Sequence, residues 1–431
     1  MERVRGFRDI YPEDMEIREK IFRESDTCSR LFGFRKIDFP SVEFLDLYRM
    51  KSGDELVQQT FSFRDRNQRE ITLIPEATPT VVRMLTARKD LPRPVRWYSF
   101  QKFWRYEEPQ AGRMREFYQY NADIFGPDSM EADSEIIMLS MRILDSIGLK
   151  KRYQIRVNNR EMMQALLENL GFRDVQKAFQ AIDRMRKLPA DQFLDEISSL
   201  IGSRKDSTEL VELLGKPMTA ADLRSLASGR KEWFSGMDDV VERTARTVEL
   251  CSSGSPSEIV IDLSIVRGLS YYTGIVFEAF DADGEFRSIL GGGRYNGLAS
   301  TFSGESIPAV GVGMGDAVLE LMMRKYGCWK TDITKKSVYV CRPPNSDTSV
   351  LAGIAATVRN LGIACMTDLS SRSLSAQFKD AARSGCAYAI ICGDAEREKE
   401  SVTIKNLESG KQELVRLDSL EKFLVEAAAD S

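Results

Sequence analysis

Arginines and carboxylates alternate with aromatic residues in one short stretch, FWRYEEPQAGRMREFYQYNADIFG, which spans residues 103–126. Arginine presents a planar fork of donors that suits phosphate and carboxylate oxygens. Arg105 precedes a turn that contains Pro and Gly, and Arg113 and Arg115 follow it two positions apart, on one face of a strand. The stretch predicts a hairpin that binds an anion, in which Glu107 and Glu116 orient the guanidiniums or hold a magnesium ion. The alternative is a solvated hairpin of ion pairs.

A second stretch, IVRGLSYYTGIVFE, places Arg267 among apolar and aromatic residues. Burying a guanidinium is costly unless a carboxylate or phosphate pairs with it. Arg267, with Tyr271 and Tyr272 close behind it, is therefore a candidate anion ligand. A structural arginine that is paired inside an aromatic core is the alternative.

Two further stretches carry weaker signals. In LIPEATPTVVR, Glu76 stands beside Thr78 at a predicted strand-to-helix transition, where a carboxylate could hold an ammonium group or simply cap the helix. GGGRYNGL and VGVGMG are glycine-rich, and glycines let the backbone approach a flat ligand closely. Neither has the spacing of a Walker loop or a dinucleotide fingerprint, so tight turns of a sheet explain them equally well.

The composition excludes several kinds of chemistry. The 431 residues include no histidine, which rules out a Ser-His-Asp triad, an imidazole base and a His-ligated metal. Catalysis would have to rest on arginines, carboxylates, hydroxyls, backbone amides and bound ions. The net charge of −4 gives no global attraction to nucleic acid, but 61 Lys and Arg residues leave room for a local basic surface.

The same composition favours a cytoplasmic protein with no membrane span. No apolar run approaches the roughly 20 residues that cross a bilayer, and the N-terminal segment MERVRGFRDIYPEDMEI is charged, without an apolar signal core. The seven cysteines contain no C-x-x-C pair, so we expect buried free thiols.

The length predicts two or three domains. Residues 1–160 mix helices with strands, including an antiparallel hairpin at 95–126 and a helix that Ser129 could cap. Residues 161–255 have a helical period and short breaks, which predicts a helical insertion; strands return in 256–330. Residues 336–431 alternate strands with helices, which predicts a separate α/β domain with a largely parallel sheet.

In their order along the chain, these segments resemble the histidyl-tRNA synthetases, a class II aminoacyl-tRNA synthetase family, in an archaeal-like variant. KIDFPSVEFLDLY resembles motif 1, with Pro40 at the dimer-forming position, and the stretch at 103–126 resembles motif 2. RGLSYYTGIVFE and GGGRYNGL resemble the two histidyl signatures, and PAVGVGMGDAVLEL resembles motif 3. Residues from about 336 resemble the anticodon-binding domain that this family shares with the glycyl, threonyl and prolyl enzymes.

The resemblance implies a fold and an activity. The fold would be an α+β catalytic core, an antiparallel sheet flanked by helices, with a helical insertion and a C-terminal α/β anticodon-binding domain. The activity would be that of a ligase, which joins histidine to ATP, releases pyrophosphate and passes histidine to the 3′ end of its tRNA. Mg²⁺ would accompany ATP, and motif 1 implies a symmetric homodimer.

The resemblance also assigns roles to individual residues. Arg105 and Arg267 would be catalytic. Histidine would contact Glu76, Thr78, Gln119, Asp123, Arg267, Tyr271 and Tyr272. ATP would contact Arg105, Glu107, Arg113, Gly313 and Gly315. The tRNA acceptor end would meet Gln110.

Four positions depart from the family pattern. Val318 stands where motif 3 normally carries an arginine, so the outer phosphates of ATP need another partner. Ser270 and Asn296 occupy the acidic positions of the two histidyl signatures, and Glu108 stands where the motif 2 loop commonly has an arginine.

Three other functions would account for part of the sequence. A regulatory histidine sensor would keep the core and lack the anticodon domain, so residues 336–431 and Arg267 argue against it. A synthetase for another amino acid, such as proline or threonine, would not need the RGLSYYTG segment. A purely structural protein would have no reason to combine these segments in this order.

Overall fold

The protein's structure, a computed structural model, describes residues 2–201, 203–252, 258–267, 271–329, 337–344 and 346–429. The chain forms two compact units, residues 1–329 and 330–431. Within the described residues, no helix has both the length and the apolar character needed to cross a membrane. All seven cysteines are free thiols, as expected from the sequence; five are buried, whereas Cys328 and Cys365 are only partly buried.

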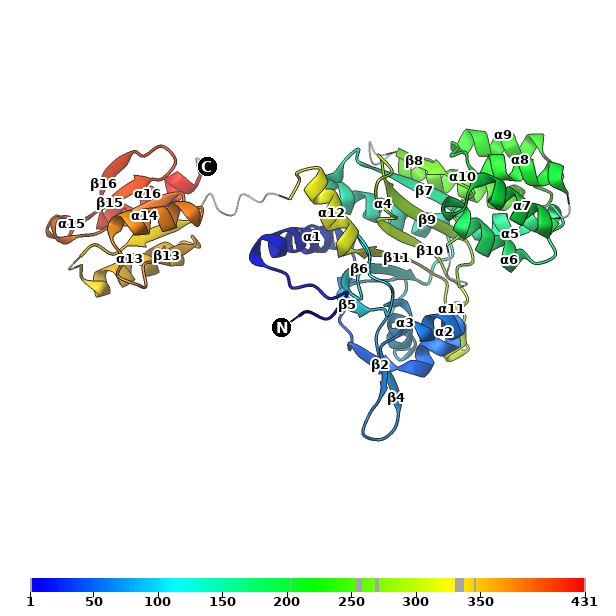
Figure 1. Ribbon diagram of the computed structural model, residues 1–431, viewed down its shortest axis with the longest axis horizontal. Coiled ribbons are helices and arrows are strands. Elements are labelled where there is room, and N and C mark those ends of the chain that lie inside the picture. Colours follow the sequence, from blue (N-terminus) through cyan, green and yellow to red (C-terminus); the bar gives the residue numbers. More distant parts are fainter. Residues whose placement is uncertain are drawn as a thin grey trace. The chain divides into compact units, whose positions relative to one another are not determined.

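An eight-stranded sheet forms the centre of the first unit (Figure 1). Its order is β1 (Arg35–Lys36), β5 (Val95–Trp104), β6 (Glu116–Phe125), β11 (Ala309–Gly315), β10 (Leu290–Arg294), β9 (Ile275–Asp281), β7 (Tyr153–Asn159) and β8 (Glu258–Ile261). Neighbouring strands run antiparallel except at the edges, where β1 pairs with β5 and β7 with β8 in parallel. The expected antiparallel α+β core is confirmed.

The predicted hairpin is the pair β5–β6, in register from Val95 opposite Phe125 to Trp104 opposite Glu116. Side chains alternate between the two faces of a strand. Tyr120 on β6 lies in the large core on one side, whereas Phe117 packs against the smaller core on the other. The polar residues of β6 share the face of Phe117, so this face of the sheet is available for chemistry.

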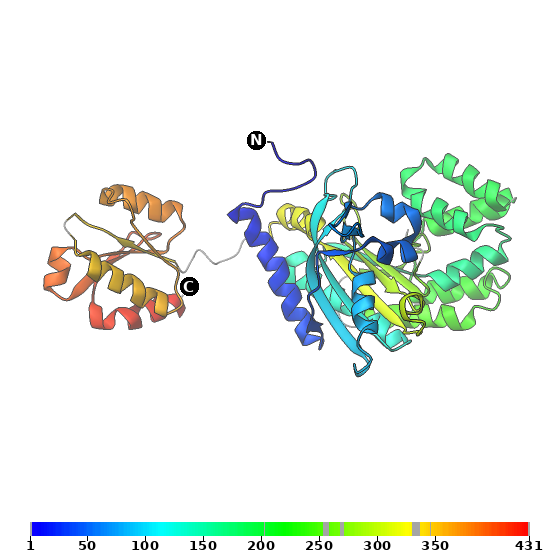
Figure 2. The same ribbon diagram turned by 90° about the horizontal axis from the view of Figure 1, so that it is seen from below.

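Helices α1 (Pro12–Leu31), α4 (Met130–Leu144) and α12 (Asp316–Lys325) contact one another or the short helix η1 (Asp145–Leu149) and pack against β6 (Figure 2). They cover the large core. Ser129 caps α4 by accepting a hydrogen bond from the Ala132 amide, as its position predicted.

Smaller elements surround the other face. Helices α2 (Leu45–Gln58), α3 (Thr78–Thr86) and α11 (Leu298–Ser303) contact one another and enclose the smaller core. A three-stranded sheet, in the order β2 (Val42–Phe44), β4 (Glu70–Leu73) and β3 (Ser62–Arg64), joins them.

Between β7 and β8 the described residues are mainly helical. The segments are α5 (Arg160–Asn169), α6 (Val175–Arg184), η2 (Met185–Lys187), α7 (Ala190–Ile201), α8 (Arg204–Leu214), α9 (Ala220–Gly229) and α10 (Asp238–Ser252). Asn159 caps α5 and Asp174 caps α6, so polar side chains at the breaks start the helices. Helix α10 packs on β7, β8 and α4, which attaches these helices to the sheet (Figure 1).

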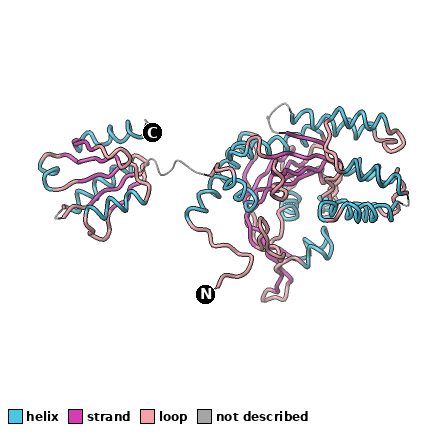
Figure 3. Tube along the Cα trace, turned by 45° about the horizontal axis from the view of Figure 1, so that its top comes forward, coloured by secondary structure: helices cyan, strands magenta, loops and turns pink. Residues whose placement is uncertain are grey.

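The second unit has its own five-stranded sheet, β13 (Cys365–Thr367), β12 (Val338–Cys341), β14 (Tyr388–Ile391), β15 (Ser401–Asn406) and β16 (Gln412–Arg416) in that order. Its helices are α13 (Thr348–Asn360), α14 (Leu374–Arg383), α15 (Asp394–Glu398), η4 (Leu417–Ser419) and α16 (Leu420–Ala429). Strands and helices alternate as far as β15, after which β16, η4 and α16 follow in turn (Figure 3).

The expectation of a largely parallel sheet is correct only for β13, β12 and β14. The pairs β14–β15 and β15–β16 are antiparallel. A parallel pair needs a long crossover, usually a helix of several turns, and the short α15 and the turn after β15 instead fold the chain straight back.

Candidate active site

A pocket opens on the β6–β11–β10 face of the eight-stranded sheet. Five segments that lie far apart in the sequence contribute to it: the start of α3, the hairpin, the segment from Arg267 to Tyr272, and strands β10 and β11. Its lining residues are Glu76, Ala77, Thr78, Arg105, Gln119, Asn121, Asp123, Arg267, Tyr271, Tyr272, Gly291, Tyr295, Gly311, Val312 and Gly313.

Most of the residues singled out from the sequence meet in this pocket: Arg105, Arg267, Glu76, Thr78, Gln119, Asp123, Tyr271, Tyr272 and Gly313. The other four, Glu107, Gln110, Arg113 and Gly315, lie outside its lining. The first three belong to the hairpin loop, and Gly315 ends β11.

The glycines of β10 and β11 make room for side chains of the protein itself. A Cβ at Gly291 would overlap the guanidinium of Arg267, and a Cβ at Gly311 would overlap the carboxylate of Asp123. Gly313 gives the same clearance to the Gln119 amide. These strands therefore form a flat floor on which charged side chains lie.

Arg267 has an unusual backbone and an incomplete set of partners. Its φ is +56°, in the left-handed region that residues with a side chain rarely adopt. One guanidinium nitrogen, Nη1, donates to Glu278 Oε1 at 2.7 Å. The buried Nε finds no hydrogen-bond acceptor among the described residues. Burial opposes the charge of Arg267, but Tyr272 and Glu278 together raise its pKa. The pocket thus holds a permanent cation with a donor to spare.

Strand β6 supplies a polar wall opposite this cation. Gln119, Asn121 and Asp123 follow at intervals of two, so all three face the pocket. The Tyr295 hydroxyl donates to the buried carboxylate of Asp123. Burial, and then the charge of Asp123, raises the pKa of Tyr295, so its hydroxyl stays protonated as a donor. The wall can accept and donate hydrogen bonds at fixed positions.

Asn121 and Tyr295 were missed as site residues in the sequence, although both signals were available. Asn121 has the alternation of a strand between Gln119 and Asp123, and Tyr295 stands inside the GGGRYNGL stretch. The ring of Tyr271 lies between the other two tyrosines, 4.6 Å from the Tyr272 ring centroid and 5.9 Å from that of Tyr295. Burial raises the pKa of Tyr271 well above its ordinary value.

The turn into α3 brings Glu76 and Thr78 to the rim. The helix starts with Pro79 in its first turn, and Ala77 at its N-cap makes no side-chain cap. Tyr48 steadies the turn by donating to the Glu76 carbonyl at 3.3 Å. Directly after β5, Arg105 donates from Nε to the Pro75 carbonyl at 2.9 Å, so hairpin and turn are joined.

The loop of the hairpin is an ion-pair network, as the alternative reading of this stretch proposed. Arg113 pairs with the Glu107 carboxylate, and Arg115 donates to the Glu107 carbonyl at 3.0 Å. Glu108 pairs with Arg5. The strands of the hairpin, in contrast, direct Arg105 and the polar residues of β6 into the pocket.

Gln110 at the loop accepts a hydrogen bond of 2.5 Å from Arg287, an exposed arginine just before β10. Sequence reasoning missed Arg287, because nothing in its local pattern indicates a contact with a loop so far away in the chain.

Val318 is buried in the large core on α12, so the apolar residue at this position is used for packing. Asn296 accepts from Arg294 and donates to Asp128, and Ser270 lies outside the described residues.

A second hollow lies beside α1 and is lined in part by Arg8, Arg18 and Lys102. Arg8 and Arg18 both pair with Asp316, and Lys102 pairs with Glu116. Because its cations are already neutralised, this hollow lacks the spare donor that distinguishes the pocket around Arg267.

Comparison with known proteins agrees with this geometry. The family model described as histidyl-tRNA synthetase matches residues 6–315, and the anticodon binding domain model matches residues 338–427. A histidine–tRNA ligase of Thermoplasma volcanium is 49% identical over 424 residues, which cover 98% of each chain. A histidine–tRNA ligase of Picrophilus torridus is 45% identical over 421 residues, 97% of this chain and 98% of the relative.

Solved structures share the fold. A histidyl-tRNA synthetase from Nostoc sp. PCC 7120 superposes with a TM-score of 0.85 at 22% identity, over 99% of both chains. A protein of Bacillus halodurans described as an ATP phosphoribosyltransferase regulatory subunit/histidyl-tRNA synthetase superposes with a TM-score of 0.75 at 23% identity, over 91% of this chain and 98% of that one.

Proposed function

The chain belongs to the histidyl-tRNA synthetase family, and we propose that it activates histidine with ATP and transfers the histidyl group to its tRNA. The observation that carries this proposal is the pocket, where a cation with a spare donor faces a wall of amide and carboxylate groups. A zwitterionic amino acid with a polar ring needs this combination of groups.

Histidine would lie with its carboxylate toward Arg267, whose Nε has no other acceptor among the described residues. Its ammonium group would meet Glu76, Thr78 and Gln119 at the rim. Its imidazole would lie between Asp123 and Tyr272, next to Tyr271. The Tyr295 hydroxyl occupies one side of the Asp123 carboxylate, which leaves the carboxylate in a fixed orientation for a ring N–H.

Such a site discriminates by polar complementarity. An apolar competitor could not replace the hydrogen bonds that the imidazole would make with Asp123 and Tyr272 in a buried place, and a site built on hydrogen bonds can reject such an analogue by roughly 10⁴- to 10⁵-fold. Apolar packing alone would separate amino acids of similar size far less well.

ATP would lie beside histidine, with its α-phosphate on Arg105. Glu107, Arg113, Gly313 and Gly315 would bind the rest of the nucleotide. In this structure Arg113 and Glu107 pair with each other, so nucleotide binding would replace that ion pair. Within the described part of the chain, no group of three or more acidic or cysteine residues could hold a metal. Mg²⁺ would therefore be held chiefly by phosphate oxygens and water, with Glu107 available as a carboxylate. Glu116 lines the hollow beside α1 instead and pairs with Lys102.

The chemistry needs no titrating side chain. The histidine carboxylate oxygen attacks the α-phosphorus in line and pyrophosphate leaves. Negative charge therefore moves from the attacking oxygen through the phosphoryl group to the leaving pyrophosphate. Arg105 and Arg267 would hold the two reactants together and stabilise that charge, which positioned cations do without proton transfer. This accounts for a catalytic unit without histidine.

The partners follow from the same proposal. The second unit would bind the anticodon, and Gln110 in the hairpin loop would meet the acceptor end of the tRNA. We place the catalytic core in residues 1–160 and 256–330, the insertion in 161–255 and the anticodon-binding domain in 336–431. A cytoplasmic location would bring the product to ribosomes.

We also propose a homodimer formed through the three-stranded sheet. Phe44 and Phe63 are both half exposed and lie opposite Ile71 from either side, which makes a row of apolar side chains across the sheet. Val42 on the same strand is also exposed. A symmetric partner would cover this row.

ATP–pyrophosphate exchange with each amino acid in turn, on the wild type and on Arg267→Ala, tests the activation step. We expect exchange with histidine alone, and its loss in the variant. Binding of histidine without any exchange would replace the proposal with a histidine-sensing function. Exchange with a different amino acid would overturn the assignment of Asp123 and Tyr272.

A further inference from the structure

Arg160 is a buried arginine that has no carboxylate partner among the described residues. It is only 7% exposed and is the first residue of α5, directly after β7. Burial lowers its pKa, and no ion pair opposes that effect. A guanidinium kept in such a place needs strong hydrogen-bond acceptors.

Its acceptors are backbone carbonyls of the segment that carries Arg267. Arg160 Nη1 donates to the Val266 carbonyl at 3.0 Å and to the Arg267 carbonyl at 3.3 Å. The face of the guanidinium lies 4.4 Å from the ring centroid of Phe179 on α6. Arg160 therefore joins helices of the region between β7 and β8 to the backbone of the pocket arginine.

Asn158, two residues earlier, acts on the same segment. Its side chain is completely buried, and its amide donates to the carbonyls of Leu263 and Ile265, each at 3.0 Å. Together, Asn158 at the end of β7 and Arg160 at the start of α5 donate hydrogen bonds to four carbonyls within residues 263–267. These acceptors would otherwise lie unpaired in a buried place.

The bonds fall where the backbone most needs support. Arg267 adopts a left-handed φ of +56°, which a residue with a side chain keeps only when its surroundings impose it. A change of this φ would swing the guanidinium away from Gly291 and out of the pocket. Clamping the carbonyl of Arg267 itself therefore fixes the direction of its side chain.

We propose that Arg160, assisted by Asn158, is a positioning residue that holds Arg267 in its working conformation. The proposal rests on the proposed function, since it assigns a cause to the geometry of that site. It also assigns a role to α5 and α6, because the stacking of Phe179 on Arg160 connects those helices to the pocket.

The test measures ATP–pyrophosphate exchange and histidine affinity for Arg160→Met, Arg160→Lys and Asn158→Ala in the full-length protein. We expect Arg160→Met to lower kcat about 10- to 100-fold and to raise the KM for histidine, with little change in the KM for ATP. Arg160→Lys should lie between it and the wild type, because an ammonium keeps the charge but not the fork of donors. Rates are divided by the active-site concentration, so a loss of folded protein alone would leave both constants unchanged.

Arg96→Met is the control, although Arg96 differs from Arg160 in that it also pairs with the Glu135 carboxylate at 2.6 Å. Arg96 also donates to a carbonyl, that of Phe32 at 2.9 Å, and lies over the ring of Phe34, but it does so on β5 away from the pocket. We expect its KM for histidine to equal that of the wild type. A similar rise in this control would overturn the proposal.

A double variant decides whether Arg160 acts through Arg267. On an Arg267→Ala background, Arg160→Met should cause no further loss of histidine affinity, measured by calorimetry. Full additivity would contradict the proposal, and so would unchanged constants in Arg160→Met.

If Arg160→Met does not fold, Arg160→Lys and Asn158→Ala decide by the same criteria. If the wild type binds histidine without exchange, the synthetase function fails, while the affinities still decide the role of Arg160.

Discussion

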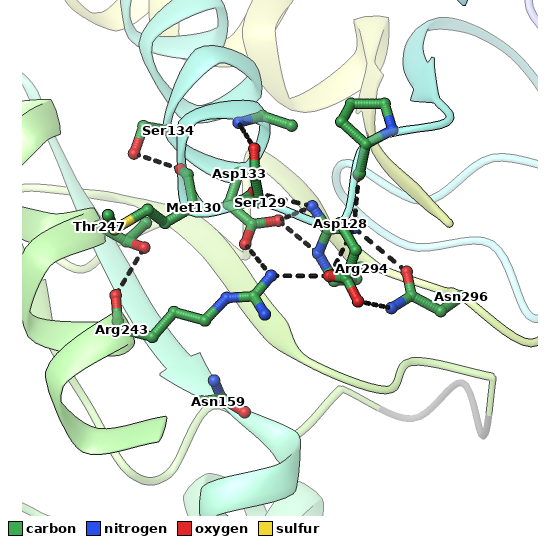
Figure 4. A network of polar contacts seen from close by, with 12 residues as sticks. Asp128, Ser129, Met130, Asp133, Ser134, Asn159, Arg243, Thr247, Arg294 and Asn296 are labelled. Carbon is green, nitrogen blue, oxygen red and sulfur yellow. Dashed lines mark hydrogen bonds and ion pairs between the residues drawn. The ribbon is translucent and has the colours of Figure 1, made fainter. Parts of the chain in front are cut away.

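Two arginines of the first unit, Arg294 and Arg267, differ in how completely the protein pairs their hydrogen-bond donors. Arg294 is 2% exposed, and Asp133 pairs with it from a fully buried position. Its other donors bind the carbonyls of Pro127 and Ser129 and the amide oxygen of Asn296. Figure 4 shows this guanidinium enclosed by acceptors on several sides.

The network of Arg294 extends to a second arginine. Arg243 on α10 donates to Asp128 at 2.9 Å and to Asp133 at 3.3 Å (Figure 4). Three segments, the start of α4, the end of β10 and helix α10, are thereby locked together. Every donor direction of Arg294 is used within the protein, so this arginine is structural.

Arg267 is paired less completely. It has one carboxylate partner, Glu278, and an Nε without an acceptor among the described residues. The comparison teaches that burial of an arginine is not itself a sign of function. In this pair, the proposed ligand-binding arginine is the one whose buried Nε has no acceptor among the described residues.

The largest expected effect is on activity. Arg267→Ala should reduce kcat/KM for histidine activation by about 10³-fold, because a positioned donor to developing charge is worth two to three orders of magnitude. Its thermal midpoint should stay close to that of the wild type. A large fall in stability with normal activity per active site would erase the contrast between the two arginines.

Arg294→Met should have the reverse effect. The change removes the nearer cation of Asp133 and leaves only the longer contact with Arg243 at 3.3 Å. Breaking such a buried pair costs about 3–5 kcal/mol of unfolding free energy. Urea unfolding of the variant measures this. Adding Asp133→Asn should recover part of the loss, and a double variant as unstable as the sum of the two singles would contradict the pairing.

A smaller effect is expected from Tyr295→Phe. The change removes the hydroxyl that orients Asp123, and the loss of one hydrogen bond to a charged group costs about 1.5–3 kcal/mol, which is roughly a 10- to 100-fold rise in the KM for histidine. The KM for ATP should not change. Equal effects on both substrates would place Asp123 outside the histidine site.

The smallest expected effect is on stability and concerns Asp128, at the edge of the Arg294 network. Burial alone would raise the pKa of Asp128, but Arg243 and Arg294 outweigh burial and lower it below its ordinary value of 3.8. The folded protein therefore gains stability from the ionised carboxylate above about pH 4 and loses it as the pH falls through the lowered pKa. Asp128→Asn should lower the thermal midpoint at pH 7, and the difference should shrink as the pH falls below about 4 and through the lowered pKa. A difference that persists at low pH would show that charge is not the cause.

Much of the fold could be predicted because its signals are local. The β5–β6 hairpin follows from alternating aromatic residues and a Pro-Gly turn, and α4 begins at the predicted cap, Ser129. The second sheet was predicted less well: strands β15 and β16 run antiparallel, and residue propensities do not encode strand direction. Direction depends on whether the connection crosses over or folds back.

The sequence by itself determined the chemistry that is possible here: no imidazole, arginines set among aromatic residues, and polar residues at alternate positions of one strand. Arg105 and Arg267 could be selected because residue type and spacing are properties of the chain, whereas Asp123 and the role of Tyr272 came from the resemblance to the family. Only the tertiary structure decided which arginine would have all its hydrogen-bond donors paired within the protein. Asp133 reaches Arg294 and Arg160 reaches the carbonyl of Arg267 across more than 100 residues, and such pairings arise from the packing of whole elements. A hydrogen bond between distant segments leaves no local pattern, which is why the spare donor of Arg267 could be recognised only in three dimensions.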